Sequence, residues 1–337
     1  MTMIVDCFNH VPDRASFRFQ LEVLGCSPGY IKLFGPRVAR SFGLEVARPV
    51  EDEVLLLREL LALAPLVPQS RGHMLDAMNE AGVDVTVVHA EDFGPGASVQ
   101  PLPRAYWEGV RSECGDRVRV LASVHPARGA KGVADLRSGI RDGLYVGVFL
   151  SPFQQQARIS AGDHDDILRC CADEGVPAWI HCGMHWDRSK SLDEDRPSVF
   201  DNLCVAFPDL RVIAGHGGWP WLLEMCALAW KHPNLYIEVS AHRPLHMLRK
   251  GSGWDPLFNF GTSALRDKVV LGTASLLLGM APKTVLDEYR ALGIPEDTLA
   301  QWLGSNAVRL YPLEGRGHAS AHNHNSVGSA ADSPRRG

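Results

Sequence analysis

The sequence predicts an α/β protein whose main domain is a closed (β/α)₈ barrel, a TIM barrel. Eight short apolar segments recur along the chain, and amphipathic segments such as residues 72–81 and 163–174 lie between them. Strands that are apolar on both faces are expected where helices cover both sides of a parallel sheet. Eight strand and helix units over about 250 residues match the barrel, which builds its active site at the carboxyl ends of its strands.

The predicted strands follow one another with helical patterns between them. In chain order they are residues 3–8, 84–90, 118–124, 145–150, 178–182, 211–216, 235–240 and 269–273. We expect one barrel domain over residues 1–312.

Two stretches fall outside this rhythm. Residues 12–70 are far longer than the usual connection of two to six residues, and we expect them to form a lid or rim insertion after the first strand. Within it we expect a helix over residues 51–64 and, because glycine is frequent there, irregular structure over residues 25–43. Residues 313–337 carry almost no large apolar side chain, so we expect a disordered tail.

Composition favours small-molecule chemistry. The formal net charge is −5 with acidic and basic residues mixed throughout, so the sequence shows no basic patch for nucleic acid or an anionic membrane. No apolar run approaches the roughly 20 residues of a membrane span. The eight cysteines lie mostly in apolar runs, which predicts buried thiols and a cytoplasmic protein.

Polar residues at the predicted strand ends are the candidates for a site. The imidazoles and carboxylates found there are Asp6, His10, His89, His125, His181, His216 and Glu238. In a barrel these ends meet at one mouth, where imidazoles serve as metal ligands or as acid and base.

Two of the carboxylates have competing interpretations. Asp6 is either a catalytic group or a brace that accepts backbone hydrogen bonds. Glu238 lies within an apolar strand, so it is either one partner of a buried pair or a catalytic acid with a raised pKa that orients His216. From the sequence we expect His89 and His125 to be structural.

The chain resembles a known family from residue 3 to about residue 311. The matching pieces include residues 4–10 (IVDCFNH), 174–181 (EGVPAWIH), 207–220 (FPDLRVIAGHGGWP), 271–273 (LGT) and 304–311 (GSNAVRLY). These resemble amidohydrolase-2 proteins of the aminocarboxymuconate-semialdehyde decarboxylase kind. The resemblance implies one divalent metal, usually zinc, held by His-x-His after the first strand, a histidine of the fifth and an aspartate of the eighth. It implies an acid–base role for His216.

Two positions depart from that pattern. Phe8 stands at the first histidine of His-x-His and Ala274 at the aspartate of the eighth strand, so His10 and His181 remain as metal ligands. Two imidazoles fall short of the three or four ligands that zinc uses. We therefore expect no cofactor or a weakly bound divalent metal, with Asp6, His216, Glu91 or Asp92 as substitute ligands. Phe149 replaces the lysine that bridges two metals in some relatives.

The resulting functional hypothesis is an enzyme that acts on a small carboxylated or aromatic molecule. Carbon–carbon lysis such as decarboxylation, or related acid–base chemistry, is preferred, with His216, His181, Asp6 and Glu238 as candidate catalytic residues. A metal-dependent hydrolase of a C–N or C–O bond is one alternative, and a catalytically silent relative that binds a small molecule is another. The resemblance also implies a possible homodimer.

Overall fold

The computed structural model describes residues 3–47 and 49–313. Of the predicted tail, residues 314–337 lie outside the described part of the chain. Leu313, which the sequence places in the tail, is buried, and its carbonyl accepts a hydrogen bond from Arg119.

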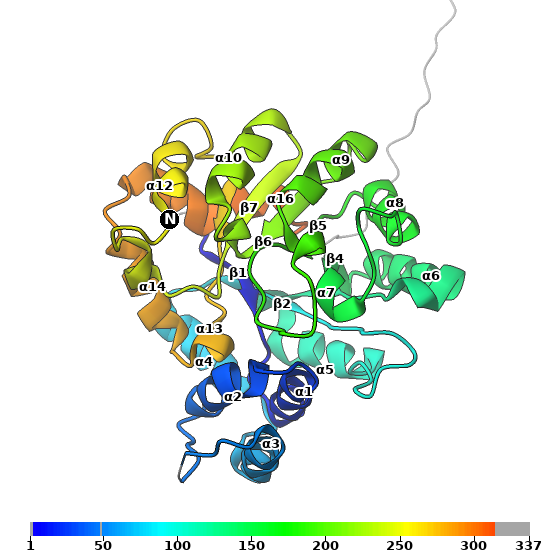
Figure 1. The fold of residues 1–337 in the computed structure, drawn as a ribbon, viewed down its shortest axis with the longest axis vertical. Helices are drawn as coiled ribbons and strands as arrows, with labels where there is room; N and C mark the ends of the chain where they lie inside the picture. Colours follow the sequence, from blue (N-terminus) through cyan, green and yellow to red (C-terminus); the bar gives the residue numbers. More distant parts are fainter. Residues whose placement is uncertain (1–2, 48, 314–337) are drawn as a thin grey trace, which may run out of the picture.

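Eight parallel strands form the predicted barrel, with neighbours in strict chain order (Figure 1). The strands are β1 (Val5–Asn9), β2 (Val85–His89), β3 (Val118–Ala122), β4 (Tyr145–Leu150), β5 (Ala178–His181), β6 (Val212–Gly215), β7 (Leu235–Val239) and β8 (Val269–Leu271). After β8 the backbone N–H of Ala274 donates to the carbonyl of Phe8 at 2.9 Å, which joins the last strand to the first. The (β/α)₈ prediction is confirmed.

Helices cover the outside of the barrel. Beyond the insertion that follows β1, the longer helices are α4 (Gly72–Ala81), α5 (Arg104–Cys114), α6 (Gly129–Arg141), α8 (Asp165–Asp173), α9 (Ser198–Ala206), α10 (Leu222–Lys231) and α14 (Pro282–Arg290). Shorter ones are α7 (Pro152–Gln155), α11 (Pro244–Met247), α12 (Asp255–Gly261), α13 (Ser275–Leu278), α15 (Glu296–Ala300) and α16 (Asn306–Leu310).

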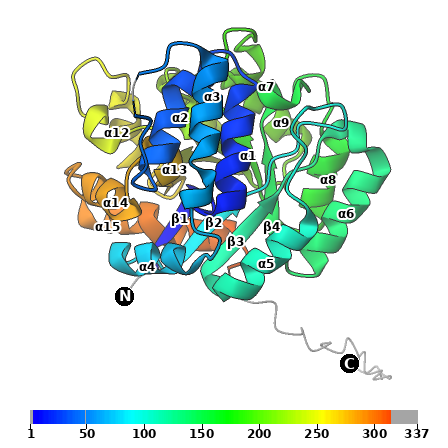
Figure 2. The same cartoon turned by 90° about the horizontal axis from the view of Figure 1, so that it is seen from below.

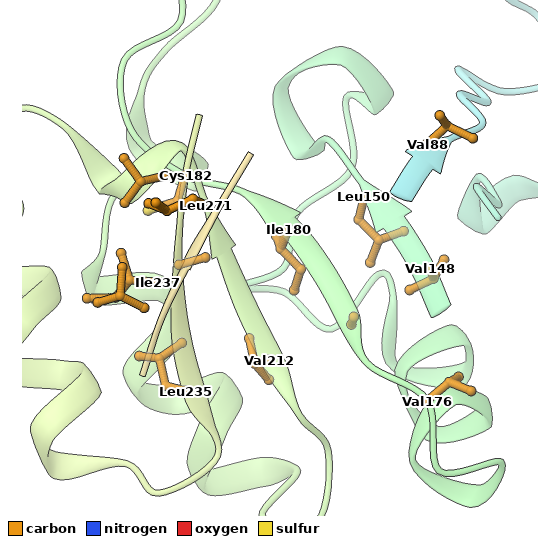
Figure 3. Packing of buried hydrophobic residues seen from close by; sticks show 14 of the residues in the cluster. Val88, Val148, Leu150, Val176, Ile180, Cys182, Val212, Leu235, Ile237 and Leu271 are labelled. Atoms are coloured by element: carbon orange, nitrogen blue, oxygen red, sulfur yellow. The ribbon is translucent and has the colours of Figure 1, made fainter. Parts of the chain in front are cut away.

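Strand alternation sorts the apolar side chains into two layers. Val148, Ile180 and Ile237 belong to the large cluster between strands and helices, part of which is shown in Figure 3. Phe149 and Trp179, one residue away in β4 and β5, belong instead to the cluster that fills the barrel. Because successive side chains of a strand point to opposite faces, a strand apolar throughout serves both layers, as the sequence analysis assumed.

The insertion after β1 folds into three helices that lie side by side, α1 (Arg14–Gly25), α2 (Tyr30–Arg40) and α3 (Glu53–Ala62) (Figures 1 and 2). The expectation of irregular structure over residues 25–43 was wrong, because α2 occupies most of it. Its apolar residues Ile31, Phe34 and Val38 recur at helical spacing and are buried. This packing outweighs the weak helix propensity of Gly35 and Pro36.

The insertion has its own apolar core, to which all three helices contribute. Gly35 permits close packing of α2 on α3, since an added Cβ would lie 2.6 Å from Leu60 Cδ1. The predicted helix over residues 51–64 forms as α3, which begins after Asp52, whose side chain accepts the backbone N–H of Leu55 at 2.7 Å.

Among the residues that the structure describes, no helix is both long and apolar enough to cross a membrane. All eight cysteines are free thiols, and all except the exposed Cys26 are buried.

Candidate active site

A cavity of about 100 Å³ opens at the carboxyl ends of the strands, beneath α1 and α2. It is lined by His10, His181 and His216, three of the imidazoles that the sequence placed at strand ends. His89, the last residue of β2, and Glu91, two residues later, also line it, as do Tyr30 and Phe34 of α2. The described structure thus brings these three predicted residues into one cavity, and the insertion provides its outer wall.

Aromatic rings stack on one another at this cavity. The ring of Phe8 stacks on Trp179 at 4.7 Å between centroids and on His89 at 4.5 Å. Phe149 stacks on His89 at 4.3 Å and on Trp179 at 4.9 Å. All four rings are buried, and Phe8, His89 and Phe149 also line the cavity, so stacked rings form part of its wall.

His181 is held by a buried carboxylate. Its Nδ1 lies 2.5 Å from Oδ1 of Asp195, whose side chain is fully buried in the loop that follows β5. A neutral imidazole that donates its Nδ1 hydrogen to a carboxylate keeps a lone pair on Nε2. Asp195 was missed by the sequence analysis because nothing in the polar loop of residues 182–197 distinguishes it from its acidic neighbours.

His216 is held in a similar way through a hydroxyl. Its Nδ1 lies 2.9 Å from Ser240 Oγ, which donates to Glu238 Oε2 at 2.9 Å, and the backbone N–H of His216 donates to the same oxygen at 3.2 Å. Since the hydroxyl hydrogen is used on Glu238, Ser240 accepts from Nδ1–H, and the lone pair of His216 is on Nε2. The rings of His181 and His216 lie 5.2 Å apart at 73°.

Burial sets the protonation states around His216. It raises the pKa of Glu238 to about 8 and, together with the nearby His181, lowers the pKa of His216 well below its ordinary value. At neutral pH the free protein therefore holds a neutral imidazole near a neutral carboxylic acid, whose proton is on Oε1 because Oε2 accepts from Ser240 and from the His216 backbone. Glu238 acts on His216 through Ser240 and the backbone, so it is a positioning residue in this arrangement.

Asp6 lies outside this cavity. Its carboxylate accepts hydrogen bonds from the Thr273 backbone N–H at 2.7 Å, from Thr273 Oγ1 at 2.6 Å and from Asn9 Nδ2 at 2.9 Å. Burial raises its pKa to about 6. It lines a neighbouring cavity of about 150 Å³. The structure places Asp6 as a link between the ends of β1 and β8.

The ends of β1 and β2 bring together His10, His89 and Glu91, all buried, with one potential ligand atom from each within 4.8 Å of the others. Glu91 Oε1 lies 3.3 Å from His89 Nε2, and Glu91 Oε2 accepts from Gln20 Nε2 of α1 at 3.2 Å. The structure places His89, expected to be structural, in the cavity wall. Its position at a strand end, shared with His10 and His181, was the signal that could have identified it.

Other polar candidates have partners elsewhere. His125 accepts from the Ala127 backbone N–H at 3.0 Å and lies 2.8 Å from the Gln155 carbonyl, in the wall of an adjacent cavity of about 530 Å³. Asp92 pairs with Arg128 at 2.8 Å. Neither residue lines the cavity of His181 and His216.

The two positions that depart from the resemblance are neighbours in space. Phe8 and Ala274 are hydrogen-bonded through their backbones and are 3% and 0% exposed. Both belong to the apolar cluster inside the barrel, and neither side chain carries a lone pair. Of the four ligands that the resemblance implies, the structure retains His10 and His181.

Comparisons with known proteins agree with this architecture. An uncharacterised TIM-barrel protein from Bordetella bronchiseptica is 21% identical with a TM-score of 0.66, covering 91% of this chain and 98% of that one. A 2,6-dihydroxybenzoate decarboxylase from Rhizobium is 13% identical with a TM-score of 0.61, covering 92% and 98%. A 5-carboxyvanillate decarboxylase from Novosphingobium aromaticivorans, in complex with manganese and 4-hydroxy-3-methoxy-5-nitrobenzoic acid, is 16% identical with a TM-score of 0.59, covering 92% and 96%.

At these identities the solved structures support the fold. No match was found among curated proteins. A family model described as amidohydrolase matches residues 5–313, nearly the whole described chain. The chain belongs to the amidohydrolase family of enzymes.

Proposed function

We propose that the protein is a carbon–carbon lyase that decarboxylates a small aromatic acid, with His216 as the group that transfers a proton. The observation that carries the proposal is the pair of imidazoles in the cavity. Each has Nδ1 occupied, by Asp195 or by Ser240, and its Nε2 makes no hydrogen bond to another described residue. Two imidazoles with fixed tautomers, 5.2 Å apart, suit the orientation and protonation of one small substrate.

The aromatic part of the cavity wall supports a planar substrate. The rings of Phe8 and Phe149 line the cavity and offer a planar substrate an apolar surface. A carboxylate placed against such an apolar surface loses hydration, which favours its conversion into neutral carbon dioxide. The decarboxylases of similar fold are named for 5-carboxyvanillate and 2,6-dihydroxybenzoate, both carboxylated rings.

The proposed step balances without a co-reactant. The bond between ring carbon and carboxyl carbon breaks, carbon dioxide leaves, and the electron pair stays on the ring carbon. That carbon takes a proton from His216, while His181 orients the substrate through Nε2. Binding of the anionic substrate beside His216 raises the pKa of its ring, because an opposite charge favours the protonated form. Because His216 is neutral in the free protein, it takes this proton on Nε2 from solvent when the substrate binds, and it is neutral again after giving the proton to the ring carbon.

We further propose that no metal is held at the position the resemblance implies. Phe8 and Ala274 offer no ligand atom, and the two imidazoles that remain are fewer than a zinc site uses. The proton-transfer step above therefore takes nothing from an ion at that position.

The experiment is a substrate panel with matched reaction types. Benzoates that carry hydroxyl or methoxy groups, labelled with ¹³C in the carboxyl, are incubated with the full chain, and ¹³CO₂ is measured. Amides and esters of the same acids form the parallel panel. Release of ¹³CO₂ supports the proposal. Hydrolysis of the amides or esters without ¹³CO₂ would overturn it in favour of a hydrolase, and inertness toward both panels would favour a silent relative.

A further inference from the structure

We propose that His10, His89 and Glu91 form a divalent transition-metal site of their own, displaced from the position that the resemblance implies. The group combines two imidazoles with one carboxylate, a ligand set that suits manganese, iron or zinc. This inference goes beyond the proposed function, whose chemistry takes no step through a metal.

The three side chains have the spacing of a ligand set. Ligand atoms at about 2.1 Å from one tetrahedral ion lie roughly 3.4 Å from each other. Glu91 Oε1 and His89 Nε2 are already 3.3 Å apart, and the third ligand atom, from His10, lies within 4.8 Å of both. The set is complete once that atom lies about 3.4 Å from the other two.

The Glu91 carboxyl has no arginine or lysine partner among the described residues. Glu91 is 6% exposed, and the contacts found for its carboxylate within residues 3–47 and 49–313 are with Gln20 and His89, with no arginine or lysine among them. A buried carboxylate without a cationic partner is costly. His10 is 4% exposed, and its Nδ1 has no hydrogen-bond partner among the described residues. A divalent cation would supply both the missing charge and a partner for an imidazole lone pair.

Neighbouring side chains also hold Glu91 and His89 in place. Gln20 of α1 donates to Glu91 Oε2 and so leaves Oε1 to face His89. Hydrogen bonds of this kind to a ligating carboxylate are typical of metal sites. Two rings, Phe8 and Phe149, stack on the His89 ring at 4.5 and 4.3 Å and restrict its movement. Phe8 thus stands where the resemblance implies a histidine ligand, and its ring packs against His89, a ligand of the displaced site.

The test measures metal binding directly, without reference to activity. The full chain is freed of metal with a chelator and titrated with Mn²⁺, with free Mn²⁺ followed by electron paramagnetic resonance. We expect one saturable equivalent. Glu91→Gln, which keeps the size of the side chain, and His89→Asn should each weaken binding at least about tenfold.

His181→Asn is the matched control. Because His181 belongs to the implied site and not to the displaced one, its loss should change Mn²⁺ affinity less than twofold. Glu91→Gln removes a buried charge and should unfold at or above the wild-type temperature in the metal-free state, which separates lost ligation from lost folding. Absence of saturable Mn²⁺ binding by the wild type would overturn the site. Weaker binding in His181→Asn with unchanged binding in Glu91→Gln would place the metal at the implied position instead.

Discussion

His216 adopts a left-handed backbone conformation, with φ of 60°, directly after β6. Histidine and asparagine tolerate this region better than most residues. His216→Asn therefore keeps the backbone while removing the imidazole. We expect kcat of the proposed decarboxylation to fall by about 10²–10⁴-fold, the range for loss of a general acid–base group.

The measurement is steady-state kinetics together with thermal unfolding. The melting temperature should stay close to that of the wild type. His246→Asn, a change on an exposed part of the surface, serves as the control and should leave kcat unchanged. Wild-type kcat in His216→Asn would move the proton transfer to another residue.

The raised pKa of Glu238 predicts that the free energy of unfolding depends on pH. Its pKa in the folded protein is about 8, above the ordinary value of 4.5, so the folded state binds a proton that the unfolded state has released between these values. The stabilisation from this proton is complete below about pH 4.5 and is lost as the pH rises through 8. Asp6 has the same sign, but its pKa of about 6 confines its effect to lower pH.

Glu238→Gln should remove this dependence above pH 6.5. From pH 6.5 to pH 8 the wild type should lose on the order of 2 kcal/mol of unfolding free energy that the variant keeps. Urea unfolding at the two pH values measures the difference. Parallel losses in the two proteins would show that Glu238 does not carry a raised pKa.

At the scale of elements, the barrel strands and helix α3 of the insertion were predictable, and helices α1 and α2 were not. Strands buried on both faces show as apolar runs, and the eight predicted runs coincide with β1 to β8 within a few residues. Helix α2 was missed because Gly35 and Pro36 lower local helix propensity, while packing on α1 and α3 decides its structure. Local sequence does not record that packing.

The same reasoning explains which parts of the site were predictable. His10, His181 and His216 could be found because strand ends of a parallel barrel share one mouth. Asp195 and Gln20 reach the site from a loop and from the insertion, and their sequence contexts hold no periodic signal. His89 also lies at a strand end, but its proposed role as a metal ligand depends on its closeness in space to Glu91 and His10, which the sequence does not show.

Packing of α2 on α3 gives a prediction about substrate binding. A side chain at Gly35 would push against Leu60 and Ile31, and Tyr30 and Phe34 of the same helix line the cavity. Gly35→Val should lower stability by about 1–3 kcal/mol, the usual cost of overpacking, and should raise KM more than it lowers kcat. Gly109→Val in α5 is the matched control, since its nearest neighbour lies at 3.6 Å. Equal KM values in the two variants would show that the position of α2 does not affect substrate binding.

At the scale of the whole molecule, His10 and His181, two of the four ligands that the resemblance implies, line one cavity. Phe8→His with Ala274→Asp would restore two ligands beside His10 and His181. Ala274 has φ of 43°, a conformation that aspartate adopts more readily than alanine. We expect the double variant to hold zinc even when Glu91→Gln is added, whereas Glu91→Gln alone should not. Elemental analysis after dialysis gives the answer, and equal zinc contents in the two proteins would show that the restored ligands do not converge.

The central claim is that His216 delivers a proton to the carbon that loses its carboxyl group. The most direct measurement is the reaction in D₂O with a substrate identified in the ¹³C panel, followed by NMR of the product ring. The account predicts one deuterium at the carbon that carried the carboxyl, formed with the same time course as carbon dioxide and at least about 10²-fold more slowly in His216→Asn. Deuterium incorporation at an undiminished rate in His216→Asn, or a product that keeps its carboxyl carbon, would contradict it.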